Sequence, residues 1–268
     1  MNNYSIGVFD SGLGGLTAVK SIMQELPNEN IVYFGDTGRL PYGTKTEATI
    51  KQYAASDIRF LLSHNVKLVV IACGTASSVA LTDMREQFDT PIVGVVEAAC
   101  EAAVRECRNG KIGVIGTSAT IKSGSYLRGL AKLAPELEVY SAACPLFVPL
   151  VENGHFDTEV TQLVIKEYLE DIKKQGVDTL ILGCTHYPLL EKAIGRYMGS
   201  NVRLISPSAE LARSLKNILG SDNLTERDST GVCEYYVSED EEGFAGLGGV
   251  VLDRKIDGQV KKIDIEKY

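Results

Sequence analysis

The sequence has no cluster of lysines or arginines and no long apolar run. Its 27 Lys and Arg are outnumbered by 35 Asp and Glu, which leaves a formal net charge of −8. An acidic chain without a basic patch gains little from phosphate contacts, so we do not expect nucleic acid as a ligand. No apolar segment approaches the ~18 residues that a membrane-spanning helix needs. The first expected strand starts near residue 5, which leaves no room for a signal peptide, and we therefore expect a cytoplasmic protein without membrane contact.

The six cysteines also lack the CxxC spacing of zinc ribbons and thioredoxin-type redox pairs. In a reducing cytosol they are expected to be free thiols. No metal site is expected, because soft ligands are few and the acids are scattered. We interpret four of the cysteines as core or filler residues: Cys100, Cys107, Cys144 and Cys233.

The glycine-rich loop at residues 10–15 lacks the third glycine of a dinucleotide-binding fingerprint, because Thr17 stands at that position. The acid at the preceding strand end, Asp10, also argues against nicotinamide or flavin. Backbone N–H groups in such a loop before a helix form an anion site, which favours a carboxylate ligand. Asp10 is then either a loop cap or a group that orients an ammonium or a thiol.

Two cysteines stand out because each directly follows an apolar strand pattern. The segment VKLVVIAC, which ends at Cys73, aligns without a gap with VDTLILGC, which ends at Cys184, at an offset of 184 − 73 = 111 residues. A second pair, 6–11 (IGVFDS) and 112–117 (IGVIGT), has an offset of 112 − 6 = 106 residues. Continuous apolar runs are typical of buried parallel strands, whose carboxyl ends form the ligand crevice. We therefore predict an α/β protein whose two related halves place the two cysteines on opposite walls of a shared cleft.

The predicted boundaries follow from the same pattern. Residues 1–97 together with 208–268 form an N-terminal α/β domain, and residues 98–207 form a C-terminal one. Further strands are predicted at 31–34, 91–96, 112–115 and 202–205, and helices at 48–64, 97–108, 156–175 and 209–219.

Several polar residues fall on loops that border the expected cleft. Thr117 and Thr120 follow a strand, and their hydroxyls either bind a ligand carboxylate or cap the next helix. Tyr42, in the stiff turn 40–43, is either a packing residue or a ligand contact. Glu152 ends an apolar run, where it is either part of a turn or a carboxylate with a raised pKa that transfers protons.

Two thiols in one cleft suit several chemistries. A hydrolase with Cys184 as nucleophile and His186 as base is one alternative, but residues two apart in a loop need not meet, and Cys73 would be idle. Disulfide redox chemistry requires the sulfurs to bond, which nothing in the spacing indicates. Racemisation uses both thiols, because one thiolate removes an α-proton and the other thiol returns a proton to the opposite face. His186 is placed to set the protonation of Cys184, and Asp10 that of Cys73.

Four motifs resemble the aspartate/glutamate racemase family, and its glutamate racemases in particular. They are FDSGLGG at 9–15, PYG at 41–43, CGTAS at 73–77 and GCTHYPLL at 183–190, of which CTHYP is the most specific. The resemblance covers most of the chain and implies two pseudo-symmetric, flavodoxin-like parallel-sheet domains. It also implies a cofactor-independent isomerase that interconverts L- and D-glutamate and supplies D-glutamate for peptidoglycan synthesis, and thereby for cell-wall biogenesis and cell shape.

The same motifs imply which residues act. Cys73 and Cys184 would be the two bases, with Asp10, Glu152 and His186 as their helpers. Substrate contacts are implied for a wider set: Asp10, Ser11, Pro41, Tyr42, Gly43, Gly74, Thr75, Thr117, Thr120, Thr185 and His186. No cofactor is implied, and a homodimer is among the assemblies that such proteins adopt.

One position departs from the family pattern. The residue after the first cysteine is usually Asn, whose amide would hydrogen-bond the substrate, and here it is Gly74. We expect weaker binding or a shifted preference at that end of the substrate. Two alternatives therefore stay open: a racemase for aspartate or a related amino acid, and a non-catalytic binding or regulatory protein. The THYP motif favours glutamate, and the presence of both cysteines favours catalysis.

Overall fold

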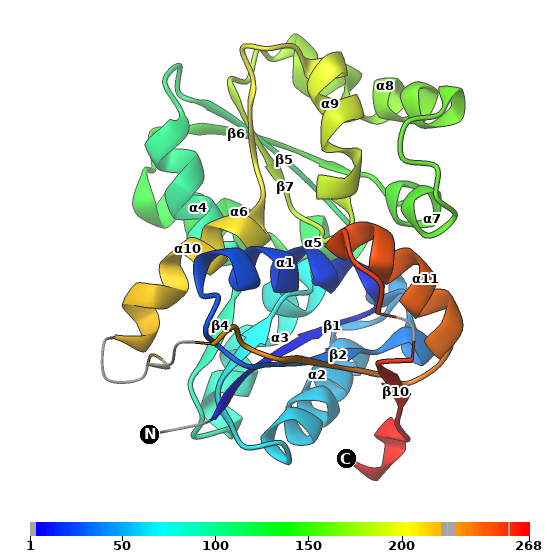
Figure 1. Ribbon diagram of the computed structural model, residues 1–268. Helices are drawn as coiled ribbons and strands as arrows, with labels where there is room; N and C mark the ends of the chain where they lie inside the picture. Colours follow the sequence, from blue (N-terminus) through cyan, green and yellow to red (C-terminus); the bar gives the residue numbers. More distant parts are fainter. Residues whose placement is uncertain (1–3, 221–223, 225–228, 257) are drawn as a thin grey trace.

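The computed structural model describes residues 4–220, 224, 229–256 and 258–268, and it contains two parallel β-sheets covered by helices (Figure 1). The larger sheet has the strand order β10-β9-β2-β1-β3-β4, and the smaller sheet has the order β6-β5-β7-β8. All pairings between these strands are parallel. The predicted α/β architecture with two parallel-sheet units is therefore confirmed.

The first sheet takes strands from both ends of the chain. In β1, Ile6 and Val8 belong to one apolar cluster and Phe9 to another. Because alternate side chains of a strand point to opposite faces, these clusters are the two layers between the sheet and its helices. The strands are β1 (Ser5–Asp10), β2 (Ile31–Gly35), β3 (Val66–Ile71), β4 (Ile92–Gly94), β9 (Cys233–Val237) and β10 (Val260–Lys262). The helices around them are α1 (Leu16–Glu25), α2 (Glu47–Leu62), α3 (Gly74–Gln87) and α11 (Glu241–Leu252).

The second sheet uses one continuous part of the chain. Its strands are β5 (Lys111–Gly116), β6 (Glu138–Ala143), β7 (Thr179–Leu182) and β8 (Arg203–Ile205). Its helices are α4 (Val95–Glu106), α5 (Ser118–Ser123), α6 (Ser125–Leu133), α7 (Phe147–Glu152), α8 (Glu159–Lys174) and α9 (Glu191–Met198). Helix α10 (Pro207–Leu219) packs against both α1 and α4 and so connects the two units. The domain boundaries at 97/98 and 207/208 stay a prediction.

Some elements differ from the sequence prediction. The strand expected at 91–96 ends at Gly94, and Val95 and Val96 begin helix α4. Both valines are buried, and a short apolar run does not distinguish a strand from a buried helical turn. The apolar run 145–152 contains α7, which tolerates Pro149 because the N–H groups of a first turn have no intrahelical partner. Four elements were not predicted from the sequence: β6, β9, β10 and α11. Of these, β6 and β10 are edge strands with partly exposed side chains and no apolar run.

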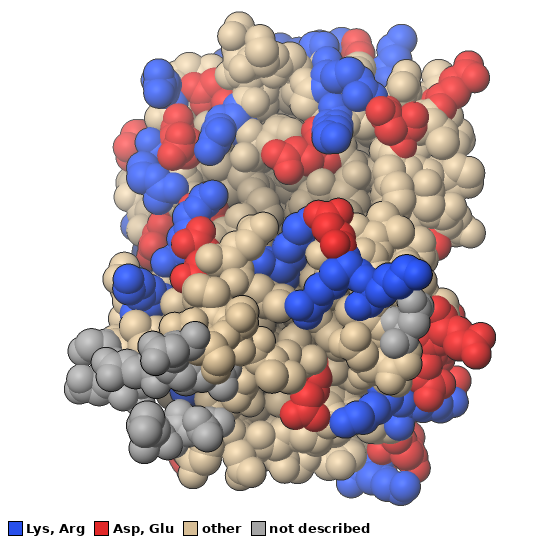
Figure 2. Space-filling model, viewed as in Figure 1, with Lys and Arg blue, Asp and Glu red and all other residues tan. Residues whose placement is uncertain are grey.

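The surface carries charges of both signs. On the face shown in Figure 2, acidic and basic side chains lie intermixed. Among the helices that the structure describes, none combines the length and the apolar character that crossing a membrane requires.

Candidate active site

The two cysteines lie where strands of both sheets end. Asp10 ends β1, Cys73 follows β3 as the N-cap of α3, and Cys184 lies just after β7. A hydrogen bond joins the loops of the two sheets, because Thr185 Oγ1 donates to Asp10 Oδ1 at 3.1 Å. The carboxyl ends of both sheets therefore border one site.

Cys184, His186 and Glu152 form a hydrogen-bonded chain. Cys184 Sγ lies 3.8 Å from His186 Nδ1, and His186 Nε2 lies 2.5 Å from Glu152 Oε1. Burial alone would lower the pKa of His186, but the hydrogen bonds and charges of Cys184 and Glu152 raise it to about 10. The imidazole is thus held as the cation, the form that stabilises a neighbouring thiolate. From the sequence alone, two residues this close in a loop need not have been in contact. The turn after β7 does bring Cys184 and His186 into contact.

Cys73 has a different environment. Its thiol donates to Ser11 Oγ at 3.8 Å, and its sulfur accepts from the backbone N–H of Ala76 at 3.5 Å. Burial, followed by the negative charge of Asp10, raises the pKa of Cys73 to about 12, so this group is a thiol at neutral pH. We expected Asp10 to set the protonation of Cys73. In the structure the thiol is hydrogen-bonded to Ser11, and Asp10 acts on Cys73 through its charge.

Asp10 is both a loop cap and a contact across the cleft. Its Oδ2 accepts from the N–H of Gly12 at 3.0 Å, while its Oδ1 accepts from Thr185. Burial raises the pKa of Asp10, and the charge of His186 together with the hydrogen bonds from Gly12 and Thr185 opposes that rise. An added Cβ on Gly15 would lie 2.3 Å from Asp10 Cβ, so the glycine loop can close around this side chain because it carries none of its own. The site therefore contains a buried carboxylate that could pair with an ammonium group.

The hydroxyls of Thr75, Thr117 and Thr120 form a buried cluster that spans the two units. Thr117 Oγ1 lies 2.9 Å from both Thr75 Oγ1 and Thr120 Oγ1, and the latter two lie 3.4 Å apart. Thr117 also accepts from the N–H of Thr120 at 3.2 Å, which confirms its role as the cap of α5. The hydroxyl hydrogens can still rotate toward a ligand carboxylate.

The loop with Pro41, Tyr42 and Gly43 packs against this cluster. An added Cβ on Gly43 would lie 2.7 Å from Thr117 Cβ, so a residue with a side chain could not approach this closely. Pro41 is exposed, whereas Tyr42 is buried with its hydroxyl bonded to two buried carboxyl groups. The phenol ring of Tyr42 is therefore a packing group, and a ligand contact from this residue would come from its backbone.

Gly74 and Gly183 bring the two cysteine loops into contact. An added Cβ on Gly74 would lie 2.4 Å from the carbonyl oxygen of Gly183 and 3.5 Å from the Cα of Cys184. The clash would be with backbone, which cannot rotate away. The sequence predicted only that Gly74 would not supply the amide donor of an Asn. The structure adds that this packing leaves no room for an Asn side chain.

A buried ionic network that was not predicted from the sequence lies beside the site. Arg39 pairs with Asp36 at 2.6 Å and with Asp57 at 2.8 Å. Asp36 follows the carboxyl end of β2, and this position was a usable signal. Asp57 lies within helix α2, where nothing in the local pattern marks a buried acid.

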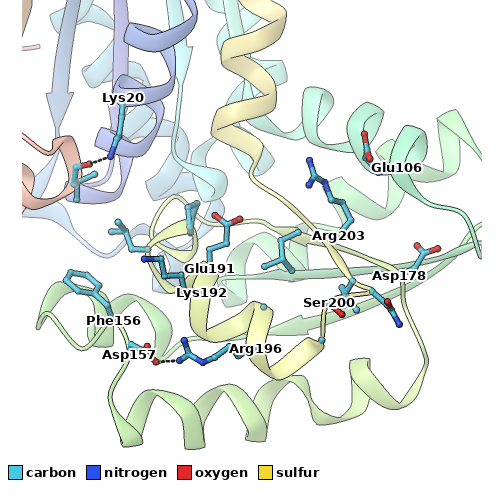
Figure 3. Close-up of a pocket in the computed structure, with 18 of the residues that line it drawn as sticks. Lys20, Glu106, Phe156, Asp157, Asp178, Glu191, Lys192, Arg196, Ser200 and Arg203 are labelled. Carbon is cyan, nitrogen blue, oxygen red and sulfur yellow. Dashed lines mark hydrogen bonds and ion pairs between the residues drawn. The ribbon is translucent and has the colours of Figure 1, made fainter.

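Other candidate positions do not belong to the two cysteine loops. A cavity of about 1330 Å³ lies beside α9 and β8, with α1 and α11 on its other side (Figure 3), and none of the proposed site residues lines it. Within the described ranges, no three His, Cys, Asp or Glu side chains are grouped so that they could hold a metal ion. The remaining cysteines are free thiols, two of them buried (Cys100, Cys144) and two half-buried (Cys107, Cys233).

Comparisons with known proteins support the family resemblance that the sequence motifs indicated. The family model for Asp/Glu/hydantoin racemases matches residues 12–215. A glutamate racemase of Geobacter metallireducens is 44% identical over 263 residues, which cover 98% of this chain and 97% of that protein. The crystal structure of a glutamate racemase isoform from Bacillus anthracis is similar with a TM-score of 0.94 at 36% identity, over 98% of each chain. That of Francisella tularensis glutamate racemase in complex with D-glutamate has a TM-score of 0.91 at 37% identity, over 100% of each chain.

Proposed function

The chain belongs to the Asp/Glu/hydantoin racemase family, and on this basis we propose that it interconverts L- and D-glutamate without a cofactor. The observation that carries the proposal is the placement of Cys73 and Cys184, from two related loops, in one buried site. The similar structure from Francisella tularensis holds D-glutamate, which supports glutamate as the substrate.

Racemisation would use the two thiols in opposite protonation states. Cys184, beside the imidazolium of His186, would act as the thiolate and remove the α-proton, and the electron pair of the broken C–H bond would move into the substrate carboxylate. Cys73, a thiol, would then deliver its proton to the opposite face and become the thiolate. One proton leaves the α-carbon and one arrives, and the reverse reaction exchanges the two roles.

The polar groups around the thiols would hold the amino acid. The buried carboxylate of Asp10 would attract the ammonium group, and the hydroxyls of Thr75, Thr117 and Thr120 would donate to a carboxylate. Both cysteines are less than one-tenth exposed, so water would be excluded while charge develops on the α-carbon.

The biological role follows from the family. The product D-glutamate would be made in the cytoplasm for peptidoglycan synthesis. A homodimer is likewise a prediction, and light scattering of the purified protein tests it.

Circular dichroism of the protein with L-glutamate, a reducing agent and no added cofactor tests the proposal. We expect the signals of L- and D-glutamate each to decay to zero. Parallel samples of L- and D-aspartate test the alternative substrate. If only the aspartate signals decay, the chain is a racemase of this family, but glutamate is not its substrate. Absence of decay and of solvent deuterium incorporation at the α-carbon would favour a binding protein.

The order Cys184, His186, Glu152 also suits a cysteine hydrolase, which is the second candidate. A hydrolase would keep its activity in a Cys73→Ala variant. Racemisation requires both thiols, so the same variant should abolish it.

A further inference from the structure

A buried network beside the cleft contains two carboxyl groups that share one phenol. The Tyr42 hydroxyl lies 2.5 Å from Asp36 Oδ2 and 2.8 Å from Asp57 Oδ2. A phenol has one hydrogen, so Tyr42 can donate to one of these oxygens and not to both. The other oxygen must supply a hydrogen of its own, or two electron-rich oxygens would face each other in a buried place.

The remaining contacts decide which carboxyl group carries that hydrogen. Asp36 already faces further donors, because it accepts from Arg39 Nε at 2.6 Å and from Ser238 Oγ at 2.9 Å. The Ser238 oxygen itself accepts from the N–H of Gly38 at 2.8 Å, which leaves its own hydrogen for Asp36. Asp36 is thus surrounded by donors, as an ionised carboxylate requires.

Asp57 has fewer donors. Its Oδ1 accepts from Arg39 Nη2 at 2.8 Å, and its Oδ2 faces the Tyr42 oxygen. Two carboxylates beside Arg39 would leave one uncompensated negative charge in a place where both side chains are 0% exposed. A neutral Asp57 removes that charge.

We propose that Asp57 is a positioning residue that stays protonated in the folded protein and donates its hydrogen to Tyr42, which in turn donates to the Asp36–Arg39 ion pair. The relay holds Tyr42, and through it Gly43, against Thr117 of the second unit. The effect of this relay on turnover rests on the proposed racemase function, whereas the protonation state of Asp57 can be tested without that function.

The surrounding charges agree with this assignment. Burial and then the charge of Asp36 raise the pKa of Asp57 well above its ordinary value, with a further contribution from Asp10 on β1, and Arg39 and Tyr42 oppose the rise. On the far side of the network, Glu266 lies 3.7 Å from Arg39, and the guanidinium lies 4.2 Å from the centre of the Tyr53 ring.

Two amide substitutions distinguish the proposed protonated Asp57 from the ionised Asp36. In Asp57→Asn the amide NH2 replaces the proposed O–H donor, so we expect kcat and KM to stay within about twofold of the wild type. In Asp36→Asn the ion pair loses its charge, and an NH2 donor replaces one acceptor oxygen, so the side chain can no longer accept from Arg39, Tyr42 and Ser238 together. KM should therefore rise about tenfold, as expected for the loss of one hydrogen bond to a charged group. Asp83→Asn, at a half-exposed carboxylate, is the control for the substitution itself.

Folding stability tests the protonation state without reference to activity. An aspartate whose pKa is raised on folding costs stability as pH rises above its unfolded pKa of about 3.9. In urea titrations, Asp57→Asn should therefore gain stability relative to the wild type as pH rises from about 4 to about 8. Infrared difference spectra of the wild type against this variant should show the carbonyl stretch of a protonated carboxylic acid.

Two results would overturn the proposal. One is a parallel pH dependence of stability in the wild type and Asp57→Asn, together with no acid carbonyl band. The other is an equal loss of stability in Asp57→Asn and Asp36→Asn. If the wild type racemises no amino acid, the stability and infrared measurements still decide the point, so failure of the proposed function is distinguishable from failure of this inference.

Discussion

Glu152 Oε1 lies 2.5 Å from His186 Nε2 and connects the end of helix α7 to the loop that carries Cys184. The His186 side chain is 3% exposed and that of Glu152 is 25% exposed, so the pair extends from the edge of the protein to a buried thiol. A carboxylate on one nitrogen of an imidazole determines how readily the other nitrogen holds a proton. Glu152 therefore influences Cys184 without touching it.

Glu152→Gln should lower the pKa of His186 from about 10 toward its ordinary value, because the amide keeps the hydrogen bond and removes the charge. We expect the alkaline limb of kcat/KM to move to lower pH and kcat/KM at pH 8 to fall about tenfold, the factor for one charged contact. A pH–rate profile measures both. Glu159→Gln, at the exposed first turn of α8, is the control, and an unmoved alkaline limb in Glu152→Gln would contradict the argument.

The raised pKa of His186 also makes folding stability depend on pH. A histidine whose folded pKa lies near 10, above its unfolded value near 6.5, contributes stability that is complete below about 6.5 and is lost as pH rises toward 10. Urea unfolding at intervals across this range should therefore show a fall in the wild type that His186→Gln lacks. His155→Gln, at an exposed histidine, should behave like the wild type, and a similar fall in His186→Gln would show that other groups cause it.

Replacing either reactive cysteine should stop racemisation. Cys73→Ala and Cys184→Ala would each remove one of the two proposed general acid–base groups, so we expect kcat to fall by about 10²–10⁴-fold. Each variant keeps one thiol, which can still reach the α-proton of one glutamate enantiomer. Nuclear magnetic resonance in D2O should therefore detect α-deuterium exchange in that enantiomer alone. Cys144→Ala removes a buried cysteine outside the two loops and should keep the rate, and an active Cys73→Ala would instead support the hydrolase.

Gly74→Ala should separate the two cysteine loops, because the added methyl group would lie 2.4 Å from a backbone oxygen. We expect kcat/KM to fall about tenfold as proton-transfer distances grow, and Gly74→Asn should show at least the same loss. Labelling with a thiol reagent, followed by peptide mapping, should find Cys73 and Cys184 more reactive than in the wild type. Gly246→Ala adds the same methyl group where no atom lies within 4 Å, and wild-type kinetics in Gly74→Ala would show that the loops do not need this contact.

Thr117→Val should weaken substrate binding beyond the loss of a helix cap. Removal of a Thr cap costs about 1 kcal/mol of stability, and Thr158→Val at the N-cap of α8 should cost the same amount. Only the Thr117 variant also loses a hydroxyl from the buried cluster, so KM should rise about tenfold there and stay unchanged in Thr158→Val. Equal KM values in the two variants would assign Thr117 to capping alone.

Much of the fold could be read from local patterns. The apolar runs before Cys73 and Cys184 predicted two buried parallel strands, and β3 and β7 stand there. The length of each apolar run and the small residues after it are local properties of the sequence, so they indicate a strand end without knowledge of the tertiary contacts. Edge strand β6 could not be found in this way, because its partly exposed side chains follow no apolar run.

The sequence by itself determined the two strand-end cysteines, the glycine loop and the motifs shared with racemases. Tertiary structure alone decided which groups touch: Ser11 rather than Asp10 bonds to Cys73, and the backbone of Gly183 limits what can stand at Gly74. It also brought Asp57 of a helix against Tyr42 of a loop. Such contacts join segments that are distant along the chain, and their geometry depends on how helices and sheets pack together, which no local pattern of residues specifies.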